Sequence, residues 1–445
     1  MMKTLWIMCV TLSLALVVEY AVATAKDEKQ APAQDWWIQG GVILDPASRS
    51  VKQQDILIHQ GRIAYLKRKP TDLSRVKRVD CHSCFLMPAF VDLHVHSSWG
   101  NPNPLGPPEP MTLEDVRERM VRAGVTSYLD LFGDEAKVFA FREKQKALGV
   151  GARFYAAGPM LTAPGGHGTQ FGIPTRVVGN RAEAKRVIQD LAQRHPDVIK
   201  IAFDHRSQEP TLRVSTLLAL LREAHKVGIP TVVHIGTWED AEQASQRGAT
   251  VITHLSPEPI PERTLNAMAK AHVLEIPTQT YQTDFYHFLQ KKKLLDSPLL
   301  HATVSEALLQ AYRTLSLSQA LELYPSYLSP QRDKEKGYQE NLRALFRRKI
   351  PLLVGTDSGA GDLGVFHGYS VHREMALWVE AGIPIWDVLW GATVGPKRFL
   401  KEPMGLAPGD KADFVILYQN PLTEIQNTET LKMVFSHGEL AYESP

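Results

Sequence analysis

Two histidines one residue apart, His94 and His96, end a short apolar run that begins at Met87. In a β-strand, successive side chains point to opposite faces, so these two imidazoles leave the same face side by side. A pair of imidazoles at a strand end suits a divalent metal ion, although a lone His-x-His motif is common by chance. The interpretation as a metal site therefore depends on partners elsewhere in the chain.

Four further polar residues lie in or at the ends of other apolar segments. They are Lys200 in residues 198–203, His234 in 230–235, His254 in 250–254 and Asp357 in 351–357. A parallel strand buried on both faces should consist of Val, Ile and Leu, and an unpaired buried lysine is costly. Each residue alone is more often a cap, a turn or a packed core group. Together the six positions predict a metal site, with Asp357 also placed for proton transfer.

The segments that carry these residues alternate with helical patterns, which predicts parallel βα units. The apolar runs fall at residues 87–96, 125–131, 152–156, 198–203, 230–235, 250–254, 272–277 and 351–357. After the first run, Thr112 opens a capping-box-like sequence followed by apolar residues at helical spacing. Eight such units predict an α/β fold, a closed (β/α)8 TIM barrel, whose active site lies at the carboxyl ends of its strands.

Short alternating runs at both ends of the chain predict a second, smaller unit. They lie at residues 37–45, 55–58 and 61–66, and again at 412–417 and 431–438. Neither set can cover its own apolar face, so we expect one composite β-sandwich domain from residues 26–87 and 403–445. The barrel is then residues 88–402. Residues 278–348 form a helix-prone insertion on the catalytic side, whose aromatic side chains are expected mainly to hold its helices together.

The N-terminus follows the order of a secretory signal peptide: Lys3, an apolar run at 5–18, and Ala23-Thr24-Ala25. We expect cleavage after Ala25, residues 1–25 as the signal peptide, and an exported, periplasmic or secreted protein. Glu19 and Tyr20 interrupt the pattern and leave a retained anchor as the alternative, but the run is shorter than a spanning helix requires. In an oxidising compartment, Cys81 and Cys84 could form a local disulfide.

The charge balance bears on one class of partner. With 50 basic and 48 acidic residues, the formal net charge is +2, and no long block of like charge is present. Nothing therefore indicates a nucleic-acid partner. We expect a small-molecule substrate and no membrane association after signal cleavage, and we leave a homo-oligomer open.

The motifs resemble those of the amidohydrolase superfamily, in particular its imidazolonepropionase-like and prolidase-type members. The resemblance is carried by residues 88–96, 199–201, 233–236, 252–254 and 355–358, and by the C-terminal return at 405–415. It covers nearly all of the chain after the signal segment, apart from the insertion.

The resemblance implies two divalent metal ions, zinc being the expected metal for imidazole and oxygen ligands. The more buried ion would be bound by His94, His96 and Asp357. The more exposed ion would be bound by His234 and His254. Lys200 would be carboxylated by carbon dioxide and bridge the ions, which also explains a buried lysine. The ions would lower the pKa of a shared water, and Asp357 would accept its proton and pass one to the leaving amine.

Candidate substrate contacts lie on loops of the expected catalytic side: His167, His205, Arg206 and Tyr281. His167 lies among glycines, while His205 or Arg206 could hold a substrate carboxylate by charge-assisted hydrogen bonds. Arg176 is a further candidate for that task.

Three other polar residues could support the site or the fold: Asp130, His372 and Glu374. Asp130 ends the second predicted strand and could orient a neighbour or serve the fold. We expect His372 and Glu374 to pack or to support other residues.

We expect an exported metal-dependent hydrolase that cleaves a C–N amide bond in dipeptides or N-acyl amino acids. The alternatives are hydrolysis of a cyclic amide, lactone or phosphotriester at the same site, and a non-catalytic binding scaffold. A cation in the pocket would favour the first class, and an apolar pocket without one the second. The scaffold is least favoured, because all six ligand positions are filled.

Overall fold

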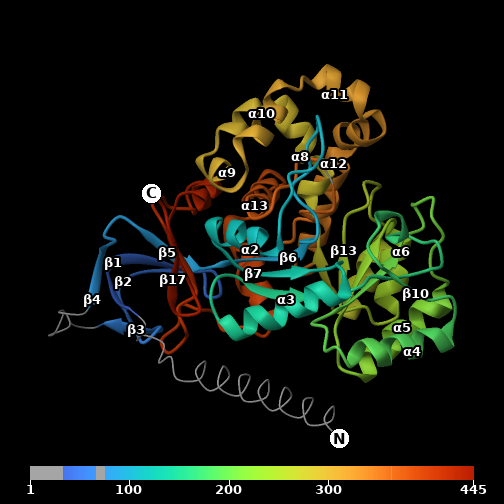
Figure 1. Cartoon of the computed structure of the whole chain (residues 1–445), viewed down its shortest axis with the longest axis horizontal. Coiled ribbons are helices and arrows are strands. Elements are labelled where there is room, and N and C mark those ends of the chain that lie inside the picture. The colour runs from blue at the N-terminus through green and yellow to red at the C-terminus, as the bar shows by residue number, and fades with distance from the viewer. Residues whose placement is uncertain (1–33, 67–75, 362) are drawn as a thin grey trace, which may run out of the picture.

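The computed structural model describes residues 34–66, 76–361 and 363–445 (Figure 1). The predicted signal segment and its cleavage site lie outside these residues. Within the described ranges, no helix combines the length and apolar character that a membrane span requires.

Parallel strands form the centre of the molecule, and helices surround them (Figure 1). The strands are β6 (Phe90–Val95), β7 (Val125–Asp130), β8 (Arg153–Ala156), β11 (Ile199–Phe203), β12 (Thr231–Ile235), β13 (Val251–Thr253) and β14 (Leu274–Ile276). The short strands β9 (Leu161–Thr162) and β10 (Arg176–Val177) extend the sheet beside β11. The backbone of residues 351–358 closes the ring: Leu353 N donates to Glu275 O at 2.8 Å, and Leu93 N donates to Val354 O at 3.1 Å. The predicted TIM barrel is confirmed.

The eighth predicted strand, residues 351–357, differs from a regular strand. It makes only isolated bridges to its two neighbours, Glu275 with Leu352 and Val95 with Ser358. Asp357 has a φ of 63°, in the left-handed region that a non-glycine residue rarely adopts. The backbone therefore turns where Asp357 N donates to His94 O at 2.7 Å, and this turn brings the carboxylate to the first strand.

The barrel helices are α2 (Leu113–Arg122), α3 (Glu135–Leu148), α4 (Arg181–Ala192), α5 (Val214–Lys226), α6 (Trp238–Gln246), α7 (Glu262–Ala271), α13 (Ser370–Glu380), α14 (Ile385–Ala392) and α15 (Val394–Phe399). The predicted capping box at the start of α2 is confirmed. Asp115 N donates to Thr112 Oγ1 at 3.1 Å, and Thr112 N donates to Asp115 Oδ2 at 2.8 Å. These bonds satisfy backbone donors that have no partner within the helix.

The insertion is helical, as predicted, and projects from one side of the barrel (Figure 1). Its helices are α8 (Gln279–Gln290), α9 (Pro298–Thr303), α10 (Glu306–Thr314), α11 (Leu317–Leu323) and α12 (Pro325–Arg347), with the 3-10 turn η2 (Lys292–Asp296). The ring of Phe285 contacts Tyr312 and Tyr324 at 6.1 and 5.8 Å between centroids. Most of the aromatic residues thus hold the insertion together, as expected.

Both ends of the chain build one β domain. Its strands are β1 (Asp35–Asp45), β2 (Ser50–His59), β3 (Arg62–Leu66), β4 (Val76–Asp80), β5 (Phe85–Pro88), β15 (Phe414–Leu417), β16 (Leu431–Ser436) and β17 (Glu439–Glu443). Strand β5 pairs in parallel with β1 on one side and antiparallel with β15 on the other, so the two chain ends share a sheet. Cys81 and Cys84 are buried here as free thiols, not as a disulfide.

A buried carboxylate, Asp413, joins this domain to the barrel. It contacts the Thr126 hydroxyl and the Arg153 guanidinium, and Lys397 Nζ lies 3.4 Å from its Oδ1. Burial by itself would raise the pKa of Asp413, but Lys397 and Arg153 outweigh this and hold the pKa below its ordinary value. The ion pairs of Asp413 with Lys397 and Arg153 therefore form a fixed electrostatic contact between the β domain and the barrel.

Candidate metal centre

The two histidines of the first strand face the carboxylate of Asp357. Nε2 of His94 and Nε2 of His96 lie 3.0 and 2.9 Å from Asp357 Oδ1. Their other ring nitrogens face Thr253 Oγ1 at 2.8 Å and Phe132 O at 3.4 Å. Because each outer contact fixes a ring, both Nε2 atoms are held toward the same point, as in metal-binding histidines.

Oδ1 of Asp357 is buried and has no hydrogen bond within the described residues, despite these short distances. An unsatisfied buried carboxylate oxygen is uncommon and calls for an explanation. Two imidazole nitrogens and one carboxylate oxygen that converge without hydrogen-bond alignment are the donor set of a divalent metal ion. The residues present therefore fit such an ion.

Two more imidazoles complete the cluster. Nδ1 of His254 lies 3.8 Å from Asp357 Oδ2 and 2.8 Å from Thr278 Oγ1. His94, His254 and Asp357 each place a ligand atom within 4.8 Å of the others. The His234 ring is 4.3 Å from the His254 ring, and its Nε2 lies 3.4 Å from an oxygen of Asp204. The imidazoles of three different strand ends thus lie together.

Lys200 projects into the same group from β11. Its Nζ lies 3.3 Å from His94 Nε2, and no carboxylate lies within ion-pair distance among the described residues. Burial lowers the pKa of Lys200 to about 7. A large fraction of this amine is therefore neutral near neutral pH, which removes part of the cost of burying it.

The protonation states suit metal binding. Burial lowers the pKa of His94 to about 3, and it also lowers the pKa of His234 and His254. Burial by itself would raise the pKa of Asp357, but the neighbouring imidazoles outweigh this and hold the pKa well below its ordinary value. Neutral imidazoles beside an ionised carboxylate are the forms that bind a metal ion.

A cavity of about 130 Å³ opens over the cluster. All six predicted ligand positions line it, and so do the predicted contacts His167 and Tyr281. The His167 ring stacks on His234 with centroids 4.5 Å apart, and Tyr281 meets the edge of His254 at 5.9 Å. The eight sequence-predicted residues from seven segments of the chain are thus brought to one place, while their chemical roles stay predictions.

Two of the other candidate contacts lie elsewhere. The His205 ring contacts Asp240, and His205 N donates to the same carboxylate at 3.1 Å. Arg206 is exposed, with its guanidinium beside Tyr338 of the insertion. Neither residue lines the cavity, so the structure does not bring them to the cluster. The sequence could not show this, because both partners are distant in the chain.

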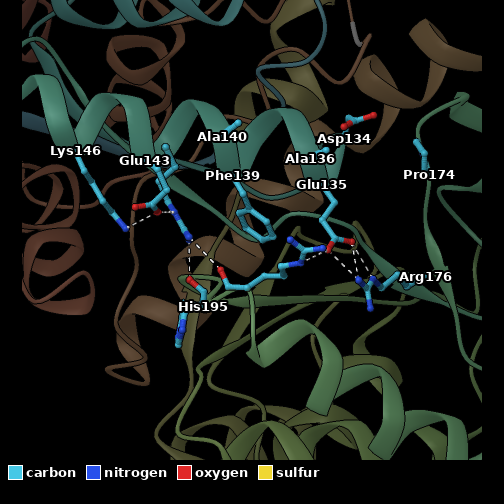
Figure 2. Close-up of a pocket in the computed structure, with 12 residues that line it drawn as sticks. Asp134, Glu135, Ala136, Phe139, Ala140, Glu143, Lys146, Pro174, Arg176 and His195 are labelled. Atoms are coloured by element: carbon cyan, nitrogen blue, oxygen red, sulfur yellow. Dashed lines mark hydrogen bonds and ion pairs between the residues drawn. The ribbon is translucent and has the colours of Figure 1, made fainter. Parts of the chain in front are cut away.

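Arg176 also faces away, into a larger surface hollow beside α3 (Figure 2). This hollow measures about 960 Å³ and includes Glu135, Glu143 and Arg176 in its wall. Arg176 Nη2 lies 2.8 Å from Glu135, and the same guanidinium contacts Asp190. Arg176 is thus paired with carboxylates, and among the described residues no group that could hold a metal ion lies in this hollow. The smaller cavity over the histidines is therefore the candidate centre.

Two buried aspartates, Asp130 and Asp92, accept hydrogen bonds from the backbone beside the cluster. Asp130 accepts hydrogen bonds from Ser97 N at 2.8 Å and Phe132 N at 3.1 Å, just after the first two strands. Asp92 accepts from His94 N at 3.1 Å and from the Thr356 hydroxyl at 2.6 Å. Asp92 was missed at the sequence level, although its position two residues before His94 in the same strand was a usable signal.

The predicted structural roles on α13 are confirmed. Glu374 accepts hydrogen bonds from Gln279 N at 2.9 Å and Thr280 N at 2.7 Å, the first residues of α8. His372 Nε2 faces Ala123 O, and its Nδ1 faces Thr428 Oγ1, both at 2.9 Å. These bonds fix the start of the insertion and the packing of α13.

A barrel with imidazole and carboxylate groups at the carboxyl ends of its strands places the chain in the class of TIM-barrel enzymes. The sequence model of the Amidohydrolase family matches residues 85–441. The chain belongs to this family, and the resemblance seen in the motifs is confirmed. Over 62 residues it is 34% identical to an adenine deaminase of Deinococcus deserti, a match that covers 14% of this chain and 11% of that enzyme.

Solved structures share the whole fold. A Xaa-Pro dipeptidase with bound methionine superposes with a TM-score of 0.71 at 19% identity, over 92% of this chain and 100% of that one. A prolidase complexed with N-methylphosphonate-L-proline gives 0.70 at 19%, over 92% and 100%. The ochratoxinase of A. niger gives 0.64 at 17%, over 92% and 96%. At these identities the likeness establishes the fold.

Proposed function

We propose that this protein is an exported, metal-dependent hydrolase that cleaves a C–N amide bond in a small molecule. The single observation that carries the proposal is the unsatisfied, buried Oδ1 of Asp357, with two imidazole nitrogens 2.9 and 3.0 Å away. This donor set needs a cation, and it lies in a cavity at the strand ends where TIM-barrel chemistry occurs.

The proposed ligands are the six predicted residues, with two zinc ions as the expected metal. Bound divalent ions would supply a water of lowered pKa and polarise the scissile carbonyl. Lys200 would serve as its carboxylated form, because a neutral amine is the form that adds to carbon dioxide and its pKa of about 7 provides that form. Asp357 would accept a proton from the attacking water and pass one to the leaving amine, as a general base and then a general acid.

His167 is proposed to orient the substrate. Its ring lies against His234 in the cavity wall, and burial lowers its pKa to about 3. A neutral imidazole can donate one hydrogen bond to a substrate oxygen. Tyr281, beside His254, offers a hydroxyl on the insertion side of the same cavity.

Likeness to a Xaa-Pro dipeptidase and to a prolidase supports dipeptides or N-acyl amino acids as the substrate class. One observation favours the second class of cyclic amide, lactone or phosphotriester: among the cavity-lining residues of the described chain, Lys200 is the only lysine or arginine. A carboxylate-bearing substrate would find no free side-chain cation there.

The experiment is a hydrolysis panel on the metal-loaded mature protein. Dipeptides, N-acyl amino acids, simple amides, a lactone and a phosphotriester would be compared before and after chelation. We expect amide hydrolysis that chelation abolishes and added metal restores. Full metal loading without turnover of any amide would contradict the amide assignment, and turnover of the lactone or phosphotriester would establish the second class.

Export is proposed on the order of residues in the first 25 positions. The intact mass and N-terminal sequence of protein recovered from a native-type host would test it. A mature chain that begins at Lys26 is the expected result, and a full-length membrane-bound chain would support the retained anchor instead.

A further inference from the structure

One wall of the cavity is apolar and was not predicted from the sequence. It consists of Trp99, Phe132, Met160 and Phe171, which follow the first three strands. The Trp99 ring lies 5.7 Å from Phe132 and 6.3 Å from Phe171, and it meets the edge of His96 at 5.8 Å. These side chains extend the ligand cluster on one side with an apolar surface.

Phe171 lies at the open edge of this wall. Its side chain is 41% exposed, in the short 3-10 turn Thr169–Phe171, and its ring contacts His167 at 5.5 Å. Together with the other members of the wall, it continues an apolar patch to the mouth of the cavity, and such contiguous patches mark ligand-binding grooves. The wall therefore offers its apolar area to whatever enters.

The same wall carries no positive charge. None of its four side chains is ionisable, and among the cavity-lining residues of the described chain Lys200 is the only lysine or arginine. Lys200 lies at the bottom, within the ligand cluster. Arg176 is held by Glu135 and Asp190, outside the cavity. A substrate carboxylate against this wall would lose water without gaining a side-chain cation, which is costly.

We propose that the wall formed by Trp99, Phe132, Met160 and Phe171 selects substrates with an uncharged ring-bearing group next to the scissile bond, and disfavours those with a carboxylate there. This rests on the proposed amide hydrolysis and narrows its substrates to uncharged amides, in place of dipeptides and N-acyl amino acids. The ring would lie against the wall, whose open edge is Phe171, with the scissile bond over the ligand cluster.

The test uses two pairs of amides that differ by one carboxylate. They are N-methylbenzamide with N-benzoylglycine, and acetanilide with 4-acetamidobenzoate. We expect the uncharged member of each pair to have about tenfold or more higher kcat/KM on the metal-loaded enzyme. Equal or higher kcat/KM for both carboxylates would overturn the proposal.

A charge introduced into the wall provides the second arm. Phe171→Arg should shift the preference toward the carboxylate members, because it adds a cation at the rim. Val177→Arg is the matched control: Val177 is 48% exposed, lies in the neighbouring strand β10 and is not part of the cavity wall. An equal shift in both variants, or none in Phe171→Arg, would contradict a specific role of the wall.

A binding measurement separates this proposal from the proposed function. If none of the four amides is hydrolysed, the amide assignment fails. Calorimetric titration of the metal-loaded protein then still tests whether the wall prefers uncharged ligands. Tighter binding of N-methylbenzamide than of N-benzoylglycine, weakened by Phe171→Arg, would support it. Tighter binding of N-benzoylglycine would overturn it.

Discussion

Nε2 of His94 lies 3.0 Å from Oδ1 of Asp357, although the two residues come from opposite ends of the barrel sequence. The left-handed backbone of Asp357, with a φ of 63°, produces this approach. Strain of this kind persists at functional sites because the surrounding structure enforces it. The contact thus joins the first and last units of the barrel at the proposed metal centre.

Asp357→Asn tests the carboxylate as proton acceptor. An amide cannot take a proton from the attacking water, so we expect kcat to fall by about 10²- to 10⁴-fold with a smaller change in KM. Steady-state kinetics at saturating metal would measure both. Asp333→Asn, in an exposed pair with Arg332 on α12, is the control and should keep wild-type turnover. Unchanged turnover in Asp357→Asn would remove this residue from the mechanism.

Lys200 is predicted to carry a carboxylate derived from carbon dioxide. After incubation with ¹³C-bicarbonate and metal, the wild-type protein should show a carbamate carbon signal by NMR. Lys200→Met keeps an unbranched apolar side chain and should lack that signal, and it should bind less metal. A carbamate signal of equal intensity in the variant, or none in the metal-loaded wild type, would contradict the modification.

Asp413→Asn should destabilise the fold, because the buried Lys397 would lose the carboxylate 3.4 Å from its Nζ and the half-buried Arg153 would keep only the longer contact with Glu402 at 3.9 Å. Breaking a buried ion pair on one side costs about 3–5 kcal/mol. The free energy of unfolding from denaturant titration would measure this cost. The exposed Asp333→Asn variant should change it by less than about 1 kcal/mol. Equal effects in the two variants would show that the link through Asp413 carries little of the stability.

The stability of the insertion should depend on pH through His287. Its ring nitrogens lie 3.2 Å from Asp284 and 3.0 Å from Glu335. Burial by itself would lower the pKa of His287, but these carboxylates outweigh it and raise the pKa from 6.5 to about 9. A raised pKa means that the stabilisation is complete below pH 6.5 and is lost as pH rises through about 9.

Between pH 6 and pH 10, the free energy of unfolding of the wild type should therefore fall by on the order of 3 kcal/mol relative to that of His287→Gln. Denaturant titrations of both proteins at the two pH values give this difference. If the stability advantage of the wild type over His287→Gln stays constant or increases with pH, His287 is not held protonated by Asp284 and Glu335.

Much of the fold could be predicted from the sequence, because the relevant signals are local. The capping box at Thr112, the apolar strand runs and the helix-prone insertion each depend on neighbouring residues. The eighth segment departs from a regular strand because the positive φ at Asp357 is imposed by contacts with His94, which the local pattern does not contain. The disulfide considered for Cys81 and Cys84 is absent from the structure, since two cysteines at this spacing permit a bond without enforcing it.

The sequence could group six residues as proposed ligands, because polar residues at strand ends conflict with the burial expected there. The structure brings these six to one cavity, and their role as ligands stays a prediction. The distant partners of Arg176 and His205, namely Glu135 and Asp240, leave no local signal. Trp99 and Phe132 could have been found, because they directly follow the first two strands on the catalytic side.

The most direct test of the metal centre is the metal content and amide hydrolysis of one purified sample. We predict about two divalent ions per chain after reconstitution with bicarbonate, together with amide turnover that is lost on chelation and regained when metal is restored. The thermal midpoint should fall in parallel on chelation, because an ion that binds only the folded state stabilises it. If no metal binds after reconstitution, the assignment of His94, His96 and Asp357 as ligands is wrong.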